Sequence, residues 1–171
     1  MKIMLDTNVL ISALFFPSQH MDLLFEKVFT EHTVVLPTYV IEELHKVTRR
    51  KFQTKMKHID DFLSNISFEL VYTPKYIDKM LVEIRDKYDY PILHTAIVEC
   101  VDVLITGDKD FLDINIERPI IMTPHEFIAN YEKIIELVTL IDALEDEQKS
   151  GEDEGWFLHE EVKEYFAQKF K

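Results

Sequence analysis

Acidic residues follow closely after two short apolar stretches of the chain, and they are the side chains best suited to carry chemistry. Asp6 comes directly after the apolar residues 3–5, and Asp108 comes soon after the run 101–105, which only Asp102 interrupts. Both stretches have the pattern of buried strands. The carboxyl ends of parallel strands meet at one edge of an open sheet, where such sheets bind ligands. Two strands that end in aspartate therefore predict one acidic site at that edge.

Further pairs of acids lie near predicted helix starts, at Glu42 and Glu43 and at Asp86 and Asp89. Carboxylates that crowd together stay ionised only when a cation lies among them. Oxygen ligands favour Mg²⁺ or Mn²⁺ over zinc, and such an ion supports attack of water on a phosphodiester. The pattern predicts metal-assisted hydrolysis. The side chains predicted to orient the ligands or the water are Asn8 and Thr106.

Each acid also has a purely structural explanation. An Asp after a strand is commonly a turn residue or a helix N-cap, two adjacent glutamates suit a solvated helix face, and aspartates ahead of Pro91 suit a helix cap. The positions of Asp6 and Asp108 favour a shared site, because each follows a strand.

The hydrophobic pattern around these acids alternates between strands and helices. Apolar or alternating runs predict strands over 2–5, 34–36, 67–72, 101–105 and 119–122. Helical spacing and helix-start residues predict helices over 9–16, 21–29, 39–52, 55–63, 74–84, 91–100 and 123–131. Thr38 is the predicted N-cap of one helix, and Cys100 is expected on the buried face of another. This alternation predicts an α/β domain with a largely parallel sheet.

Length and composition exclude several other classes of protein. The chain of 171 residues is 47% hydrophobic and has 12 Phe, enough for one domain with a core and an appendage. No apolar run approaches the ~20 residues needed to span a bilayer. Cys100 is the only cysteine, which excludes a disulfide framework and a Cys-based zinc site. No glycine comes before Gly107, which excludes a glycine-rich phosphate loop near the start of the chain. The start of the chain has no signal-peptide pattern, so we expect a cytoplasmic protein without a membrane partner.

Four motifs, in order along the chain, resemble those of the PIN-domain nucleases, and in particular the VapC-like toxins of bacterial toxin–antitoxin pairs. They are LDTNVL at 5–10, EEL at 42–44, RDKYDYPIL at 85–93 and TGDKDFL at 106–112. Residues 119–127 are similar to the end of the domain in that subgroup. The resemblance covers residues 1–131 and implies a Mg²⁺- or Mn²⁺-dependent endoribonuclease with a three-layer α/β/α, PIN-like fold.

The resemblance also implies which residues form the site. The family's catalytic, metal-binding acids correspond to Asp6, Glu43, Asp89 and Asp108, and a further metal ligand corresponds to Asp110. Glu43 is preferred to Glu42 because the family's acid precedes a Leu, as Glu43 precedes Leu44. Tyr90 departs from the subgroup, which more often has a small polar residue before the Pro, but this removes no ligand.

The densest basic run begins one turn after Glu43, and we expect it to hold RNA phosphates beside the metal site. Its RNA-binding residues are predicted to be Lys46, Arg49, Arg50 and Lys51. The structural alternative is a solvated helix face. The resemblance leaves open an antitoxin protein partner and a homo-oligomer. The alternative to an enzyme is a catalytically silent PIN-like module that binds RNA or a protein.

Beyond residue 131 the composition changes. Residues 132–171 hold 12 Asp and Glu against 5 Lys, and so carry −7 of the net charge of −13. They predict an acidic, mostly helical C-terminal extension with a flexible linker near 145–155. Trp156 and Phe157 follow this linker. One hypothesis is a terminal helix that packs on its own domain, and the other is an inhibitory segment whose carboxylates compete with RNA phosphates.

Overall fold

A computed structural model of the chain describes residues 1–74, 90–112, 114, 116–135 and 138–141. The chain divides into two compact units, Met1–Ala129 and Asn130–Lys171. All strands of the described residues lie in the first unit. In the second unit, residues 131–135 and 138–141 are helical, and the predicted linker near 145–155 lies outside the described residues. The division of the chain into a nuclease domain and an acidic extension stays a prediction.

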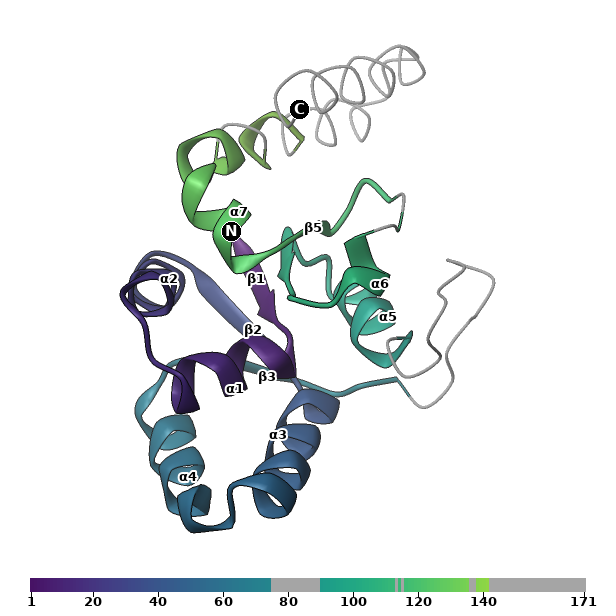
Figure 1. Cartoon of the computed structure of the whole chain (residues 1–171). Helices are drawn as coiled ribbons and strands as arrows, with labels where there is room; N and C mark the ends of the chain where they lie inside the picture. Colours follow the sequence, from purple (N-terminus) through teal and green to yellow (C-terminus); the bar gives the residue numbers. More distant parts are fainter. Residues whose placement is uncertain (75–89, 113, 115, 136–137, 142–171) are drawn as a thin grey trace. The chain divides into compact units, whose positions relative to one another are not determined.

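The first unit is built on a parallel sheet of five strands with the order β3-β2-β1-β4-β5 (Figure 1). The strands are β1 (Lys2–Leu5), β2 (Thr33–Pro37), β3 (Glu69–Val71), β4 (Val103–Ile105) and β5 (Ile120–Met122). Every neighbouring pair is parallel. The three inner strands are almost entirely buried, which explains why they are continuous apolar runs and do not alternate.

Helices connect the strands and pack on the sheet (Figure 1). They are α1 (Thr7–Phe15), α2 (Gln19–Glu31), α3 (Thr38–Lys51), the 3₁₀ turn η1 (Gln53–Lys55), α4 (Met56–Asn65), α5 (Tyr90–Val98), α6 (Lys109–Leu112) and α7 (Pro124–Ala129). The α/β fold class with three layers and a parallel central sheet is thereby confirmed. The helix predicted over 74–84 falls on residues outside the described part of the chain, apart from Pro74.

Asp102 fixes the register of the central strands at their amino ends. Its carboxylate accepts a hydrogen bond from the backbone N–H of Lys2 at 2.6 Å and lies 2.9 Å from the Arg118 guanidinium. The backbone N–H of Asp102 also donates to the carbonyl of Lys2 at 2.9 Å. These contacts align β1 with β4, so that Leu5 pairs with Ile105 and the two strands end level. This alignment determines which residues meet at the opposite, carboxyl edge.

Two local predictions were wrong. Thr38 is the first helical residue of α3 and not its N-cap, which is Pro37. The Thr73 hydroxyl, from the segment after β3, accepts from the N–H of Tyr39 at 3.1 Å, so the end of α3 is satisfied by a residue distant in sequence. Cys100 is exposed and not buried.

The exposure of Cys100 results from the way α5 ends. The N–H of Cys100 donates to the carbonyl of Ile97, and the N–H of Val101 donates to the carbonyl of Ala96. This is the Schellman arrangement, which places the residue after the helix in the left-handed region. Cys100 has φ of 50° accordingly. The turn directs its side chain away from the core.

Candidate active site

The ends of β1 and β4 bring Asp6 and Thr106 into contact at the carboxyl edge of the sheet. The N–H of Asp6 donates to the carbonyl of Ile105 at 3.0 Å, which continues the strand pairing by one residue. The Thr106 hydroxyl then donates to Asp6 Oδ2 at 2.7 Å. Both side chains are buried. Two residues that are 100 positions apart in the sequence therefore form one unit at this edge.

The segment after β4 connects two more acids to this unit. The N–H of Asp108 donates to the Thr106 hydroxyl at 3.0 Å, and the N–H of Asp110 donates to Asp108 Oδ1, also at 3.0 Å. Asn8 Nδ2 lies 3.4 Å from Asp6 Oδ2, a long hydrogen bond. The hydrogen bonds thus run continuously from Asp6 through Thr106 to Asp108 and Asp110. Thr106 and Asn8 both lie against Asp6, where they can orient its carboxylate.

Helix α3 contributes Glu43. This residue is half-buried, and its Oε2 accepts a hydrogen bond of 2.6 Å from the hydroxyl of Thr7, the first residue of α1. Glu42, its neighbour in sequence, is exposed and lies on a different side of α3. The structure therefore joins Glu43, and not Glu42, to the segment that carries Asp6. Asp89 and Asp86 lie outside the described residues.

Burial and the neighbouring acids change the titration of Asp6. Removal from water raises the pKa of Asp6 above its ordinary value, and the hydrogen bond from Thr106 opposes this. The charges of Glu43 and Asp108 raise the pKa further. The net direction is upward, so ionised Asp6 is disfavoured in the folded protein. Glu43 and Asp108 are therefore each close enough to Asp6 to repel its carboxylate.

The donor set suits a hard divalent cation. Carboxylate oxygens are the ligands that Mg²⁺ and Mn²⁺ prefer, and a cation would relieve the repulsion felt by Asp6. In the described part of the chain, no three His, Cys, Asp or Glu side chains already converge as the ligands of one ion. The acids that would hold an ion are Asp6, Glu43 and Asp108, with Asp89 and Asp110 as further predicted ligands.

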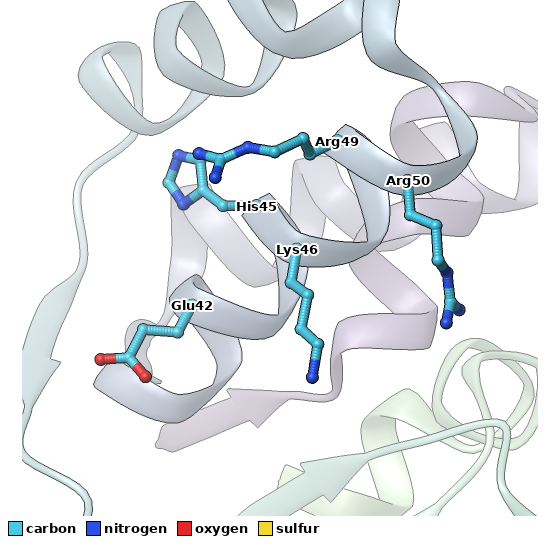
Figure 2. A pocket seen from close by; sticks show the side chains of 5 residues that line it. All are labelled: Glu42, His45, Lys46, Arg49 and Arg50. Carbon is cyan, nitrogen blue, oxygen red and sulfur yellow. The ribbon is translucent and has the colours of Figure 1, made fainter.

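Cationic side chains project from another side of α3 (Figure 2). They line a shallow hollow of about 390 Å³ together with Glu42 and His45, and they are Lys46, Arg49 and Arg50. None of these three forms an ion pair with an acid in the part of the chain that the structure describes. Lys51 is exposed at the end of the same helix and does not line the hollow. Among the described residues, these positive charges are thus not neutralised by an acid.

One residue of the acidic cluster escaped the sequence analysis. Thr7 lies between Asp6 and Asn8 in the first motif, but its partner Glu43 is 36 residues further along the chain. The motif itself was the available signal, because carboxylates that bind metals are commonly held by hydrogen bonds from neighbouring side chains. Only the packing of α1 beside α3 shows which acid it contacts.

Comparison with known proteins agrees with this fold. The family model described as PIN domain matches residues 2–110. The chain belongs to the PIN-domain family. The resemblance to PIN-domain nucleases is thereby confirmed, and members of this family are generally nucleases.

Individual relatives extend the match. The chain is 27% identical over 149 residues to the uncharacterized protein MJ1680 of Methanocaldococcus jannaschii, covering 78% of this chain and 94% of that protein. In structure it is similar to a chain of VapBC2 from Rickettsia felis, crystallised with a DNA fragment from their promoter. That match has a TM-score of 0.58 and 23% identity, and it covers 72% of this chain and 98% of the other. At this identity the likeness shows a shared PIN fold. Within the described residues, no helix is long and apolar enough to cross a membrane.

Proposed function

We propose that this PIN-domain protein is a Mg²⁺- or Mn²⁺-dependent endoribonuclease and acts as the toxin of a toxin–antitoxin pair. The observation that carries the proposal is the buried carboxylate of Asp6, whose pKa is raised by burial and by the charges of Glu43 and Asp108. Such a cluster is unfavourable by itself and becomes favourable around a cation.

The acids hold the ion, and the neighbouring side chains orient the acids. Asp6, Glu43 and Asp108 would bind the cation together with Asp89, and Asp110 would assist from the start of α6. The ion, when bound, supplies an activated water and neutralises charge on the phosphodiester. The Thr106 hydroxyl fixes one oxygen of Asp6 at 2.7 Å, and this limits the directions from which the carboxylate can bind a ligand.

The cationic side of α3 contacts the RNA backbone. Lys46, Arg49 and Arg50 present positive charge in one hollow, with no acid paired to them among the described residues, and Lys51 continues the charge to the end of the helix. Phosphate contacts of this kind position the nucleic acid without reading its bases. These cationic side chains gather positive charge on one side of α3, although the net charge of −13 by itself opposes binding to a polyanion.

The toxin assignment and the antitoxin partner rest on similarity. The VapC-like motifs of the sequence and the fold shared with a VapBC2 chain both support them. A protein that binds over the acidic edge would block the substrate and so control the enzyme.

A cleavage assay on the full chain tests the proposal. The protein is incubated with a mixed RNA pool in Mn²⁺ or in EDTA, beside the variants Asp6→Asn, Asp108→Asn and the exposed control Asp61→Asn. Cleavage should require Mn²⁺, be lost in the first two variants by about 100-fold or more, and persist in the control. RNA binding without cleavage in any condition would instead identify a catalytically silent module.

A further inference from the structure

The hydroxyl of Thr7 makes a short contact with Glu43 that the proposed chemistry does not yet explain. The separation between Thr7 Oγ1 and Glu43 Oε2 is 2.6 Å. Hydrogen bonds from a hydroxyl to an ionised carboxylate have this length, and they are about twice as strong as neutral ones. Thr7 is 2% exposed, so its side chain has a fixed place in the fold. The contact connects the start of α1 with the second turn of α3.

This use of a threonine differs from that of several hydroxyls within the helices. Ser12, Thr30 and Thr95 each donate to the backbone carbonyl four residues earlier in their own helix. Thr7 is the first residue of α1, directly after a strand, and it donates to a side chain of another helix. The Thr7 bond is therefore a tertiary contact and not a local helix feature.

Thr7 and Thr106 act on two acids in the same way. Thr106 donates to one oxygen of Asp6, and Thr7 donates to one oxygen of Glu43. In each case a hydroxyl holds one oxygen of the carboxylate, Oδ2 of Asp6 and Oε2 of Glu43. A carboxylate with one oxygen fixed has fewer orientations to lose when it binds an ion, which raises its affinity.

We propose that Thr7 is a positioning residue, which orients Glu43 for the divalent cation and so completes the acidic edge. The inference rests on the proposed function, since it assigns Glu43 a ligand role. It adds a residue whose role is carried by its contact with Glu43. Its effect should pass entirely through Glu43.

The test is a double-mutant cycle on the full chain. The variants are Thr7→Val, which keeps the shape and removes the hydroxyl, Thr7→Ser, which keeps the hydroxyl, Glu43→Gln, and Thr7→Val combined with Glu43→Gln. Mn²⁺ affinity is measured by calorimetric titration, RNA cleavage is measured as kcat and KM, and thermal unfolding in EDTA confirms that each variant is folded. The cycle separates an effect through Glu43 from a general structural effect.

Thr7→Val should weaken Mn²⁺ binding by about 10- to 100-fold, as loss of the partner of a ligand typically does. Cleavage should fall mainly in kcat, because the RNA contacts on α3 are unchanged. Thr7→Ser should restore Mn²⁺ affinity to within about threefold of wild type, since the hydroxyl is retained. In the Glu43→Gln background, Thr7→Val should cause little further loss.

Two results would overturn the assignment of Thr7 alone. One is a Thr7→Val protein that binds Mn²⁺ as well as wild type, and the other is an equal loss from Thr7→Val in both Glu43 backgrounds. A wild-type protein that neither binds Mn²⁺ nor cleaves RNA would overturn the proposed function itself, and with it the ligand role of Glu43.

Discussion

Replacing Asp6 with Asn should stabilise the metal-free protein even though it destroys the proposed activity. Burial raises the pKa of Asp6, against the lowering effect of the Thr106 hydrogen bond, so the folded state disfavours the ionised carboxylate. Burying the charge of Asp6 costs the folded wild type several kcal/mol, and the charged hydrogen bond from Thr106 returns about 1.5–3 kcal/mol of this. Asp6→Asn removes the remaining cost, so its free energy of unfolding should be higher than that of wild type by roughly 1–2 kcal/mol. In a chain of this length that gain corresponds to a Tm increase of roughly 2–8 °C.

The sign of the pH dependence follows from the same upward shift. The folded state binds the Asp6 proton more tightly than the unfolded chain does. The stability that this proton contributes is fully present below the ordinary carboxyl pKa and is lost as the pH rises through the raised pKa of Asp6. The Tm of wild type in EDTA should therefore fall relative to that of Asp6→Asn as the pH increases from about 4 towards neutrality.

Thermal unfolding followed by circular dichroism measures both effects, in EDTA and in saturating Mn²⁺. At a metal concentration of 100 times Kd, wild type should gain about 2.7 kcal/mol, whereas Asp6→Asn should gain little, so the order of stability reverses. Asp61→Asn, the same change at an exposed site on α4, should stay within about 0.5 kcal/mol of wild type in both conditions. An Asp6→Asn protein less stable than wild type in EDTA at neutral pH would refute the reasoning.

Two further predictions concern the proposed RNA-binding side of α3 and the stability of the protein at low pH. Arg49→Glu combined with Arg50→Glu should weaken RNA binding, because two phosphate contacts are lost. The slope of log affinity against log salt concentration should become shallower by about 1–2. The control Lys57→Glu on α4 should change the affinity and the slope much less. An unchanged slope in filter-binding titrations would place the RNA elsewhere. Burial lowers the pKa of His32, and the charge of the N-terminus lowers it further. The folded protein therefore favours neutral His32. The stability linked to this neutral form is present above the ordinary histidine pKa and is lost as the pH falls. His32→Gln should therefore lose less Tm than wild type between roughly pH 6.5 and 5, and an equal loss in the two proteins would exclude this role.

Sequence patterns alone predicted the strands, most of the described helices and the family. The inner strands are recognisable because strands buried on both faces must be apolar throughout, as in residues 3–5 and 34–36. The motifs that begin at Leu5 and Thr106 predicted the PIN family, which the match over residues 2–110 confirms. The acids could be assigned to one edge of the sheet because parallel strands end on the same side. The strands and the motifs could be recognised because each depends on neighbours within a few residues.

The tertiary structure alone decided which residues meet. Thr106 contacts Asp6 because β1 and β4 are adjacent and in a register that Asp102 fixes from the far end of the strands. Thr7 contacts Glu43 because α1 and α3 pack together. A periodic pattern shows that a strand is buried, but it does not show which strand lies beside it or at what offset. Those contacts depend on strand order and register, and therefore on the packing of the whole sheet.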